Sequence, residues 1–231
     1  MTLLEASDIR ISRRAYIPEL ISDEKKTALL SIIADIQARS GIRIKLMEDG
    51  ENCFSLIKSY GMFSGVRSYF ALIGNSDDPK MHEKIGYFGE ELVLEATRLG
   101  LGTCWVAGSY DKSSVSLKLG EKESLACVIS VGEIKETENL KEKFLSGIIK
   151  TKRKSPEEMS IGYATAPEWF KKGVECAVNA PSARNKQPVI FEYSADKATA
   201  RVNGNFSFNK IDLGIAEYHF ELGSGNKITE F

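Results

Sequence analysis

A short polar segment near the end of the chain carries the side chains best suited to bind a flat, polar ligand. Residues 180–188 have the sequence Ala-Pro-Ser-Ala-Arg-Asn-Lys-Gln-Pro. Asn185 and Gln187 are two residues apart, so in an extended segment both amides point to one side. Each amide offers donors and an acceptor, which suits a ring edge with alternating carbonyl and N–H groups, such as that of a flavin. The alternative is a polar turn between a helix and a strand.

The elements around this segment are a preceding helix and a following strand. Pro167 fits the first turn of the helix, and its apolar positions recur at helical spacing at Phe170, Val174 and Ala177. A strand is expected at 188–193, with a short hairpin arm at 201–202. Asn209 is expected to cap a last helix, whose apolar face consists of Ile211, Ile215, Tyr218 and Leu222.

The first two thirds of the chain mix helices and strands without a regular alternation. Ser22 predicts a helix start, Gly41 predicts its end, and strands are expected at 42–46 and 68–73. The strongest helix is expected over 83–99, before Gly100 in a left-handed terminus. Buried strands are expected at 103–106 and 125–131, the second in a central position. The charged run 133–160 is typical of a linker or a solvated surface. This order favours an α+β layer fold over a doubly wound one.

Composition excludes several classes of protein. Lysine plus arginine (31) nearly balances aspartate plus glutamate (32), so neither nucleic acid nor an anionic membrane is expected as a partner. No stretch is apolar enough to cross a bilayer and no signal peptide is evident, so a cytoplasmic protein is expected. The four cysteines are widely spaced, which predicts buried free thiols rather than zinc ligands or disulfides. Rossmann and P-loop motifs are missing from the sequence, and no Cys–His or Ser–His–Asp set is evident.

The segment 180–188 resembles the signature of the FMN-dependent nitroreductase family. The resemblance implies that Ser182, Asn185 and Gln187 contact the flavin ring and ribityl chain. A second segment, Leu94-Glu-Ala-Thr-Arg-Leu-Gly-Leu-Gly-Thr-Cys-Trp-Val-Ala-Gly108, resembles the family's helix, glycine turn and following strand. The resemblance therefore implies that main-chain groups of Val106, Ala107 and Gly108 face the flavin, with Gly108 near its N5 atom. Trp105 would pack at the ring edge or in the core.

Basic residues would hold the FMN phosphate according to the same resemblance. The family's Arg-Arg-Ser-x-Arg start is matched by Arg13 and Arg14, while Ala15 and Ile17 replace its serine and third arginine. A basic stretch at 150–154 resembles a second phosphate-binding run of the family, which implies roles for Arg153 and Lys152. Arginine suits phosphate because it donates two parallel hydrogen bonds. The alternative for Arg13 and Arg14 is a solvated pair.

The order of these segments departs from the usual nitroreductase order, because the 180–188 segment follows the 94–108 segment. The chain resembles a divergent single-chain lineage with rearranged motifs. The implied fold has three layers, with a mostly antiparallel mixed sheet flanked by helices. The sequence Ile85-Gly-Tyr-Phe-Gly-Glu faintly resembles Ile211-Asp-Leu-Gly-Ile-Ala-Glu, by chance or by repetition. We expect a single domain, 1–231, with two pseudo-symmetric halves at about 1–150 and 151–231, as a monomeric pseudo-dimer or a homodimer.

The implied activity is NAD(P)H-dependent reduction of small molecules by a ping-pong mechanism. FMN would take hydride at N5 from NADH or NADPH and pass electrons to a nitroaromatic, a quinone or a similar acceptor. The cofactor carries this chemistry, so no catalytic side chain and no metal is expected. Two alternatives stay open. The flavin could serve dehalogenation, flavin destruction or ligand sensing, or the chain could be a binding module without flavin.

Overall fold

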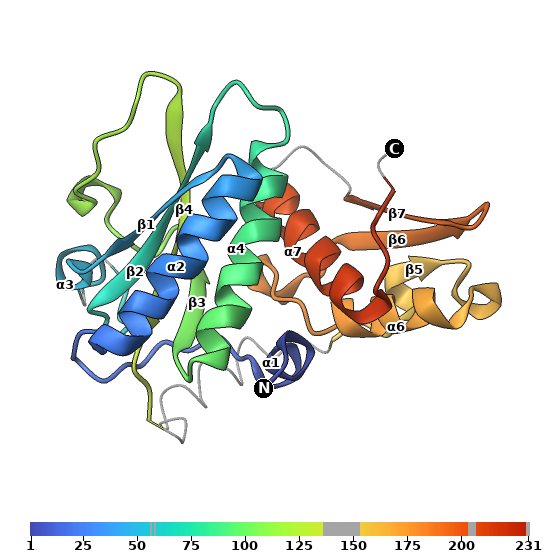
Figure 1. The fold of residues 1–231 in the computed structure, drawn as a ribbon, viewed down its shortest axis with the longest axis horizontal. Helices are drawn as coiled ribbons and strands as arrows, with labels where there is room; N and C mark the ends of the chain where they lie inside the picture. Colours follow the sequence, from blue (N-terminus) through green and yellow to red (C-terminus); the bar gives the residue numbers. More distant parts are fainter. Residues whose placement is uncertain (56, 58, 136–152, 203–206, 230–231) are drawn as a thin grey trace. The chain divides into compact units, whose positions relative to one another are not determined.

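The computed structural model of the 231-residue chain describes residues 1–55, 57, 59–135, 153–202 and 207–229. Helices and strands are mixed along the chain (Figure 1). In chain order the elements are α1 (Leu3–Ile9), α2 (Asp23–Ser40), β1 (Arg43–Met47), α3 (Gly50–Cys53), β2 (Ser68–Asn75), α4 (Met81–Arg98), β3 (Gly102–Val106), η1 (Lys112–Ser114), β4 (Glu123–Gly132), η2 (Glu157–Met159), β5 (Ser160–Ile161), η3 (Tyr163–Thr165), α6 (Glu168–Ala177), η4 (Ala183–Asn185), β6 (Val189–Ser194), β7 (Lys197–Val202) and α7 (Ser207–Ser224).

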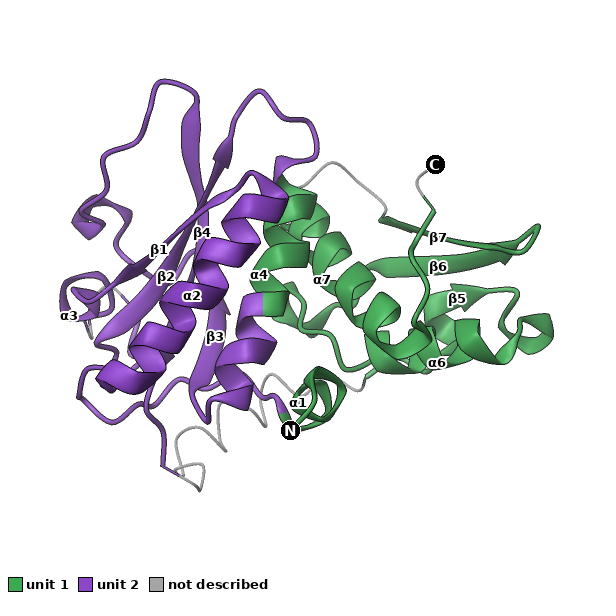
Figure 2. Cartoon of the chain, viewed as in Figure 1, with its two compact units in different colours: residues 1–9, 82–91, 147–231 green, residues 10–81, 92–146 purple. Residues whose placement is uncertain are grey.

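The chain divides into two compact units, which Figure 2 shows in different colours. Unit 1 consists of Met1–Ile9, His82–Glu91 and Gly147–Phe231, and unit 2 consists of Arg10–Met81 and Leu92–Ser146. Helix α4 therefore contributes its first turns to unit 1 and its last turns to unit 2. The division into pseudo-symmetric halves at 1–150 and 151–231 stays a prediction.

Unit 2 is built on a four-stranded antiparallel sheet with the order β1-β2-β4-β3. In β2, Ser68 to Gly74 are buried at every position, as expected for a central strand covered on both faces. Strand β4 is also central, as predicted. Helix α2 packs against β1 through its apolar stripe, of which Leu29, Ile33 and Ile36 are buried. Gly41 ends this helix with φ 72°, a left-handed conformation that glycine adopts without strain.

Aromatic side chains form much of the core of unit 2. The Phe54 ring packs edge-on against Phe63 and Tyr69, with centroid distances of 5.2 and 5.8 Å. Tyr110 stacks on the same ring at 6.2 Å. Such offset and edge-to-face pairs add stability beyond the area that they bury. The core therefore anchors the short helix α3 and the segment after β3 to the sheet.

Unit 1 combines helices α6 and α7 with a three-stranded sheet of order β5-β6-β7. Strand β5 is parallel to β6, whereas β6 and β7 form an antiparallel hairpin. Phe220 of α7 stacks on Phe191 of β6 at 4.9 Å and meets Phe170 of α6 edge-on at 5.5 Å. A Cβ atom at Gly173 would lie 2.6 Å from the Phe220 ring, so this glycine allows the two helices to approach closely. These contacts fix the elements on either side of the 180–188 segment.

The α+β architecture and nearly all of the predicted elements are confirmed. The strands form two sheets, and the left-handed glycine after α4 is confirmed by φ 74° at Gly100. Two helix starts differ: α7 begins at Ser207 rather than after Asn209, and Pro167 is the N-cap of α6. Capping preferences fix helix ends only to within one or two residues. Of the charged run 133–160, residues 136–152 lie outside the described part, and Met159 in the remainder is 1% exposed.

The cysteine prediction is confirmed, since Cys53, Cys104, Cys127 and Cys176 are all free and buried. Burial raises the pKa of the Cys127 thiol to about 12. None of the helices in the described part of the chain has the length and apolar content of a membrane span. The same residues contain no group of three or more His, Cys, Asp or Glu placed to hold a metal ion.

Candidate cofactor site

The segment between α6 and β6 forms a tight turn instead of the extended run that the amide spacing suggested. Residues Ala183–Asn185 make a single 3₁₀ turn. Arg184, Asn185 and Gln187 take positive φ values of 55°, 53° and 46°. Non-glycine residues in this region are strained and persist only where surrounding contacts hold them. Asn185 and Gln187 therefore do not lie in an extended segment, and the prediction that their amides point to one side of it is wrong.

Gln187 is buried, with 4% exposure, and its amide is bonded within unit 1. Its Oε1 accepts the main-chain N–H of Lys154 at 2.8 Å, and its Nε2 donates to the Val178 carbonyl at 3.0 Å. The Lys154 ammonium donates to the Gln187 carbonyl at 2.8 Å. Gln187 thus joins the basic segment at 153–154 to the end of α6. No signal in the sequence distinguished this structural task from ligand binding.

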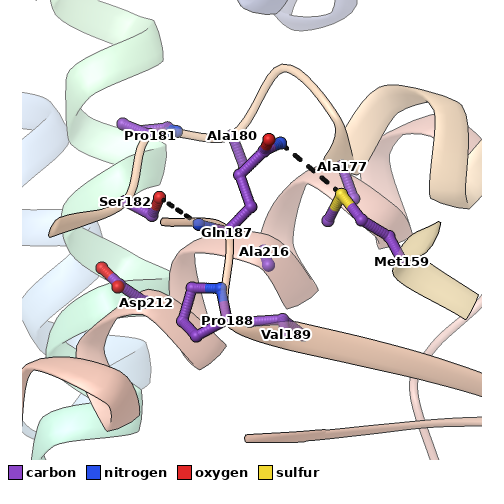
Figure 3. A pocket seen from close by; sticks show the side chains of 10 residues that line it. All are labelled: Met159, Ala177, Ala180, Pro181, Ser182, Gln187, Pro188, Val189, Asp212 and Ala216. Atoms are coloured by element: carbon purple, nitrogen blue, oxygen red, sulfur yellow. Dashed lines mark hydrogen bonds between the residues drawn. The ribbon is translucent and has the colours of Figure 1, made fainter. Parts of the chain in front are cut away.

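Ser182 and Asp212 lie on one side of a small recess in unit 1 (Figure 3). The Ser182 Oγ accepts the Gln187 N–H at 2.9 Å. The Asp212 carboxylate, on α7, accepts the Ala183 N–H at 3.0 and 3.1 Å through its two oxygens. The cavity volume of about 10 Å³ is room for one water-sized group. A flavin ring would therefore lie outside this recess, against its rim.

The basic residue predicted from the 150–154 run lies near the other end of the segment. Arg153 is exposed, and its Nη1 donates to the Asn179 Oδ1 at 2.6 Å. Asn179 directly precedes Ala180, so the guanidinium lies close to the start of the 180–188 segment. Lys152 falls outside the described residues. Unit 1 therefore brings Arg153, Ser182, Gln187 and the turn with Asn185 together around one short stretch of chain.

The N-terminal arginine pair lies beside β3 in unit 2. Arg13 is 5% exposed, and its Nη2 donates to the Lys135 carbonyl at 3.1 Å. Its main-chain N–H donates to the Thr103 carbonyl at 2.8 Å. Arg14 is half-buried and its carbonyl accepts the Ser64 N–H at 2.9 Å. The interpretation of both arginines as a solvated pair is wrong for Arg13, whose guanidinium is used inside the unit.

Three residues predicted to face the flavin lie at the end of β3 and directly after it. Val106 is the last residue of β3 and is 2% exposed, Ala107 is half-buried, and Gly108 is exposed. Trp105 is half-buried, between the two alternatives expected for it. Unit 2 thus places the arginine pair beside β3 and the 106–108 segment at the C-terminal end of the same strand. This group belongs to unit 2, whereas the group around residues 180–188 belongs to unit 1.

A buried Cys–His–Glu chain is the feature that the sequence did not reveal. The Cys176 Sγ lies 4.0 Å from His219 Nδ1, and His219 Nε2 lies 2.9 Å from Glu90 Oε1. His219 and Glu90 are fully buried in unit 1. Burial raises the pKa of the Cys176 thiol to about 11, so this thiol is protonated at neutral pH and is no nucleophile. These contacts are structural, and the absence of a catalytic Cys–His set stays a prediction.

Comparison with known proteins identifies the fold and then the family. A crystal structure of a Thermotoga maritima MSB8 protein described as "a putative nitroreductase" matches with a TM-score of 0.66 and 21% identity, over 96% of this chain and 83% of that one. The chain belongs to the family described as "Putative TM nitroreductase", whose family model matches residues 2–224. The mixed helices and antiparallel strands are those of the nitroreductase fold, and the resemblance drawn from the motifs is confirmed.

Other solved structures match over a smaller share of the chain. An FMN-dependent nitroreductase from Clostridium difficile R20291 has a TM-score of 0.48 and 20% identity, over 58% of this chain and 88% of that one. A nitroreductase with bound FMN from Desulfitobacterium hafniense DCB-2 has a TM-score of 0.46 and 19% identity, over 60% and 92%. The comparison with curated proteins gives no match.

Each of the two groups contains residues whose chemistry suits part of a flavin mononucleotide. A Cβ atom added at Gly108 would meet no described atom within 4 Å, so the main chain there is open to a flat ligand. The exposed Arg153 supplies a cation for a phosphate, and the half-buried Asn185 carries an amide for a ring edge. The buried Arg13 and Gln187 fit less well as direct contacts, because both are engaged inside the protein.

Proposed function

We propose that the chain is an FMN-dependent oxidoreductase that takes reducing equivalents from NADH or NADPH and delivers them to a nitroaromatic, a quinone or a similar small acceptor. The observation that carries the proposal is membership of a nitroreductase family over residues 2–224. The segment 180–188 and the segment ending at Gly108 support it. Bound FMN would supply the hydride chemistry, and donor and acceptor would use it in turn by a ping-pong mechanism.

The chain's own residues would bind and orient the cofactor. Asn185 would read the ring edge with its amide, and the main chain at 106–108 would lie against the ring. Ser182 would act from the rim of the recess. Arg14 in unit 2 is one candidate to hold the phosphate, and Arg153 with Lys152 in unit 1 is the other. Arg13 would support Arg14 from inside unit 2, since its guanidinium is bonded to the Lys135 carbonyl. The proposed reaction requires no acid–base side chain from the protein, because the cofactor carries the chemistry.

The first test is the colour of the purified full chain. A yellow protein that absorbs at about 450 nm, as flavins do, and that NADH or NADPH bleaches without air supports the reductase. A yellow protein that neither donor bleaches points to another use of flavin. A colourless chain that takes up no added FMN overturns the proposal. Chromatography of the same sample separates a monomer from a homodimer.

The phosphate contact is tested by comparing FMN with riboflavin, which lacks the phosphate. Changing Arg14→Gln together with Arg153→Gln should weaken FMN binding by tenfold or more and leave riboflavin binding nearly unchanged, because each charge-assisted bond to phosphate is lost. Lys197→Gln, in an exposed part of β7, is the matched charge control. Equal loss for both ligands would show that these arginines shape the fold rather than bind phosphate.

One observation favours a second function: the side chains of Gln187 and Arg13 form hydrogen bonds inside the protein. In that case the chain is a binding module that keeps the nitroreductase fold without flavin. The colour test decides between the two functions. Asn185→Ala adds a second criterion, because it should weaken FMN binding in the enzyme and should change nothing in the module.

A further inference from the structure

Asp212 is a buried carboxyl group beside the proposed flavin segment, and no role is yet assigned to it. It lies on α7, is 5% exposed, and points into the recess that Ser182 and Gln187 also line (Figure 3). The neighbouring side chains there include Met159, Pro188 and Val189. A carboxyl group in such surroundings is costly to bury unless it is hydrogen-bonded.

The polar partner of this carboxyl is the main chain of the turn. Both carboxylate oxygens accept the Ala183 N–H, at 3.0 and 3.1 Å. That amide opens the 3₁₀ turn in which Arg184 and Asn185 have positive φ values of 55° and 53°. Because such conformations need support from outside the turn, the contact with Asp212 fixes the backbone that carries Asn185.

The charge around Asp212 is unbalanced. Among the described residues that line the recess, from η2, α6, the 180–188 segment, β6 and α7, Asp212 is the one titratable side chain. The two basic residues of the segment, Arg184 and Lys186, are exposed, and Lys154 donates to the Gln187 carbonyl. Burial raises the pKa of Asp212 to about 7, with the Ala183 hydrogen bond acting in the opposite direction. The carboxyl therefore changes charge in the neutral range.

We propose that Asp212 is the positioning residue of the flavin-binding segment, which it holds in its binding conformation through the Ala183 amide. This rests on the proposed flavin binding of the chain. An ionised carboxylate accepts a hydrogen bond more strongly than a neutral acid. The turn is therefore best ordered with Asp212 ionised, and flavin affinity rises as pH increases through the neutral range.

The experiment measures the affinity of the full chain for riboflavin and FMN at pH 6, 7 and 8 by flavin fluorescence. Riboflavin is the main probe because the FMN phosphate itself titrates near pH 6. Wild type should bind riboflavin at least threefold more tightly at pH 8 than at pH 6. Asp212→Asn, which still offers an oxygen to Ala183, should show no such pH dependence. Asp212→Ala should bind at least tenfold more weakly at every pH.

Asp196→Asn is the matched control, because Asp196 is exposed in the turn between β6 and β7. It should keep the wild-type affinity and pH profile. Wild-type affinity in Asp212→Ala, or a wild-type pH profile in Asp212→Asn, overturns the positioning role. If Asp212→Ala does not fold, as far-ultraviolet circular dichroism would show, the Asp212→Asn profile decides. A wild-type chain that binds neither flavin overturns the proposed function, and the role of Asp212 with it.

Discussion

Gly86 of α4 and Gly214 of α7 approach each other's helix at matching positions. A Cβ atom at Gly86 would meet the Ile211 carbonyl oxygen and the Ile215 nitrogen, whereas one at Gly214 would meet the Glu83 carbonyl oxygen and the Tyr87 nitrogen. Each glycine thus faces the residue three before and the residue one after the other glycine. The contact has local two-fold symmetry within unit 1, and it joins the two helices whose sequences faintly resemble each other.

Adding a methyl group at this contact should destabilise the protein strongly. Gly214→Ala is expected to lower the free energy of unfolding by about 3 kcal/mol or more, because two rigid backbones must separate. Gly108→Ala, where no described atom would be within 4 Å, should change it by less than about 0.5 kcal/mol. Urea unfolding of both variants without flavin gives the comparison. A mild effect at Gly214 would mean that the helices have room to shift.

The buried pair of His219 and Glu90 should be sensitive to loss of one partner. His219→Ala leaves the Glu90 carboxyl without the ring nitrogen 2.9 Å away, and we expect a loss of about 3–5 kcal/mol in unfolding free energy. Glu90→Gln keeps a hydrogen-bonding group of the same size and should cost clearly less. His82→Ala, at a half-buried site, is the control. Equal losses at His219 and His82 would contradict this view of the pair.

Tyr16 ties the N-terminal segment to β4. Its hydroxyl donates to the Arg13 carbonyl at 2.7 Å and lies 2.7 Å from the Ser130 Oγ. Tyr16→Phe should therefore lower the unfolding free energy by about 1–3 kcal/mol, because buried polar atoms lose a partner. Tyr60→Phe, at a residue that is 82% exposed, should have almost no effect. Thermal unfolding of the two variants side by side distinguishes these outcomes.

All four thiols should be unreactive in the folded chain. Burial raises the pKa of Cys53, Cys127 and Cys176, the last to about 11, whereas an unfolded thiol has a pKa of about 8.5. At pH 8, Ellman's reagent should label the native protein far more slowly than the urea-unfolded protein, in which all four cysteines react. Rapid labelling of one native thiol would place that cysteine nearer to solvent than described.

The stability of the protein without flavin should fall as pH rises from about 4 to 7. The folded-state pKa of Asp212 is raised from 3.8 to about 7, so the folded state binds an extra proton within this range. Stability is then lost as the pH rises through it, by up to about 4 kcal/mol. Asp212→Asn should lack this contribution. If the free energy of unfolding changed with pH in the same way for wild type and Asp212→Asn between pH 4 and 8, the prediction would be contradicted.

The sequence predicted the elements whose signals are local. The apolar stripe of α4 and the continuous apolar runs of β2 and β4 depend on residues close in sequence, and these elements are confirmed. The left-handed glycines Gly41 and Gly100 carry a local signal of the same kind. The family resemblance also rested on short segments, which is why it survived a rearranged order.

The features that the sequence missed depend on contacts between distant residues. A polar turn at 180–188 was one of the two alternatives, but the contact with Asp212 that holds the turn at 183–185 could not be predicted from the segment itself. The pair of His219 and Glu90 joins residues 129 positions apart. Gln187 matched a motif, yet its burial comes from Lys154 and Val178. Side-chain type indicated which residues are polar, and only the tertiary structure shows where their hydrogen bonds are made.

Unit 1 is built from segments that are far apart in the sequence, and this has a consequence for synthesis on the ribosome. Its helix contact joins Gly86 to Gly214, which is made about 130 residues later, or roughly 6–26 s later at elongation rates of about 5–20 residues per second. Once Gly132 has been translated, every strand of the four-stranded sheet is present, whereas the first turns of α4 still lack their partner helix. The nascent chain therefore exposes the helix face that carries Gly86 until α7 has been translated, and this is the period in which a chaperone would matter most.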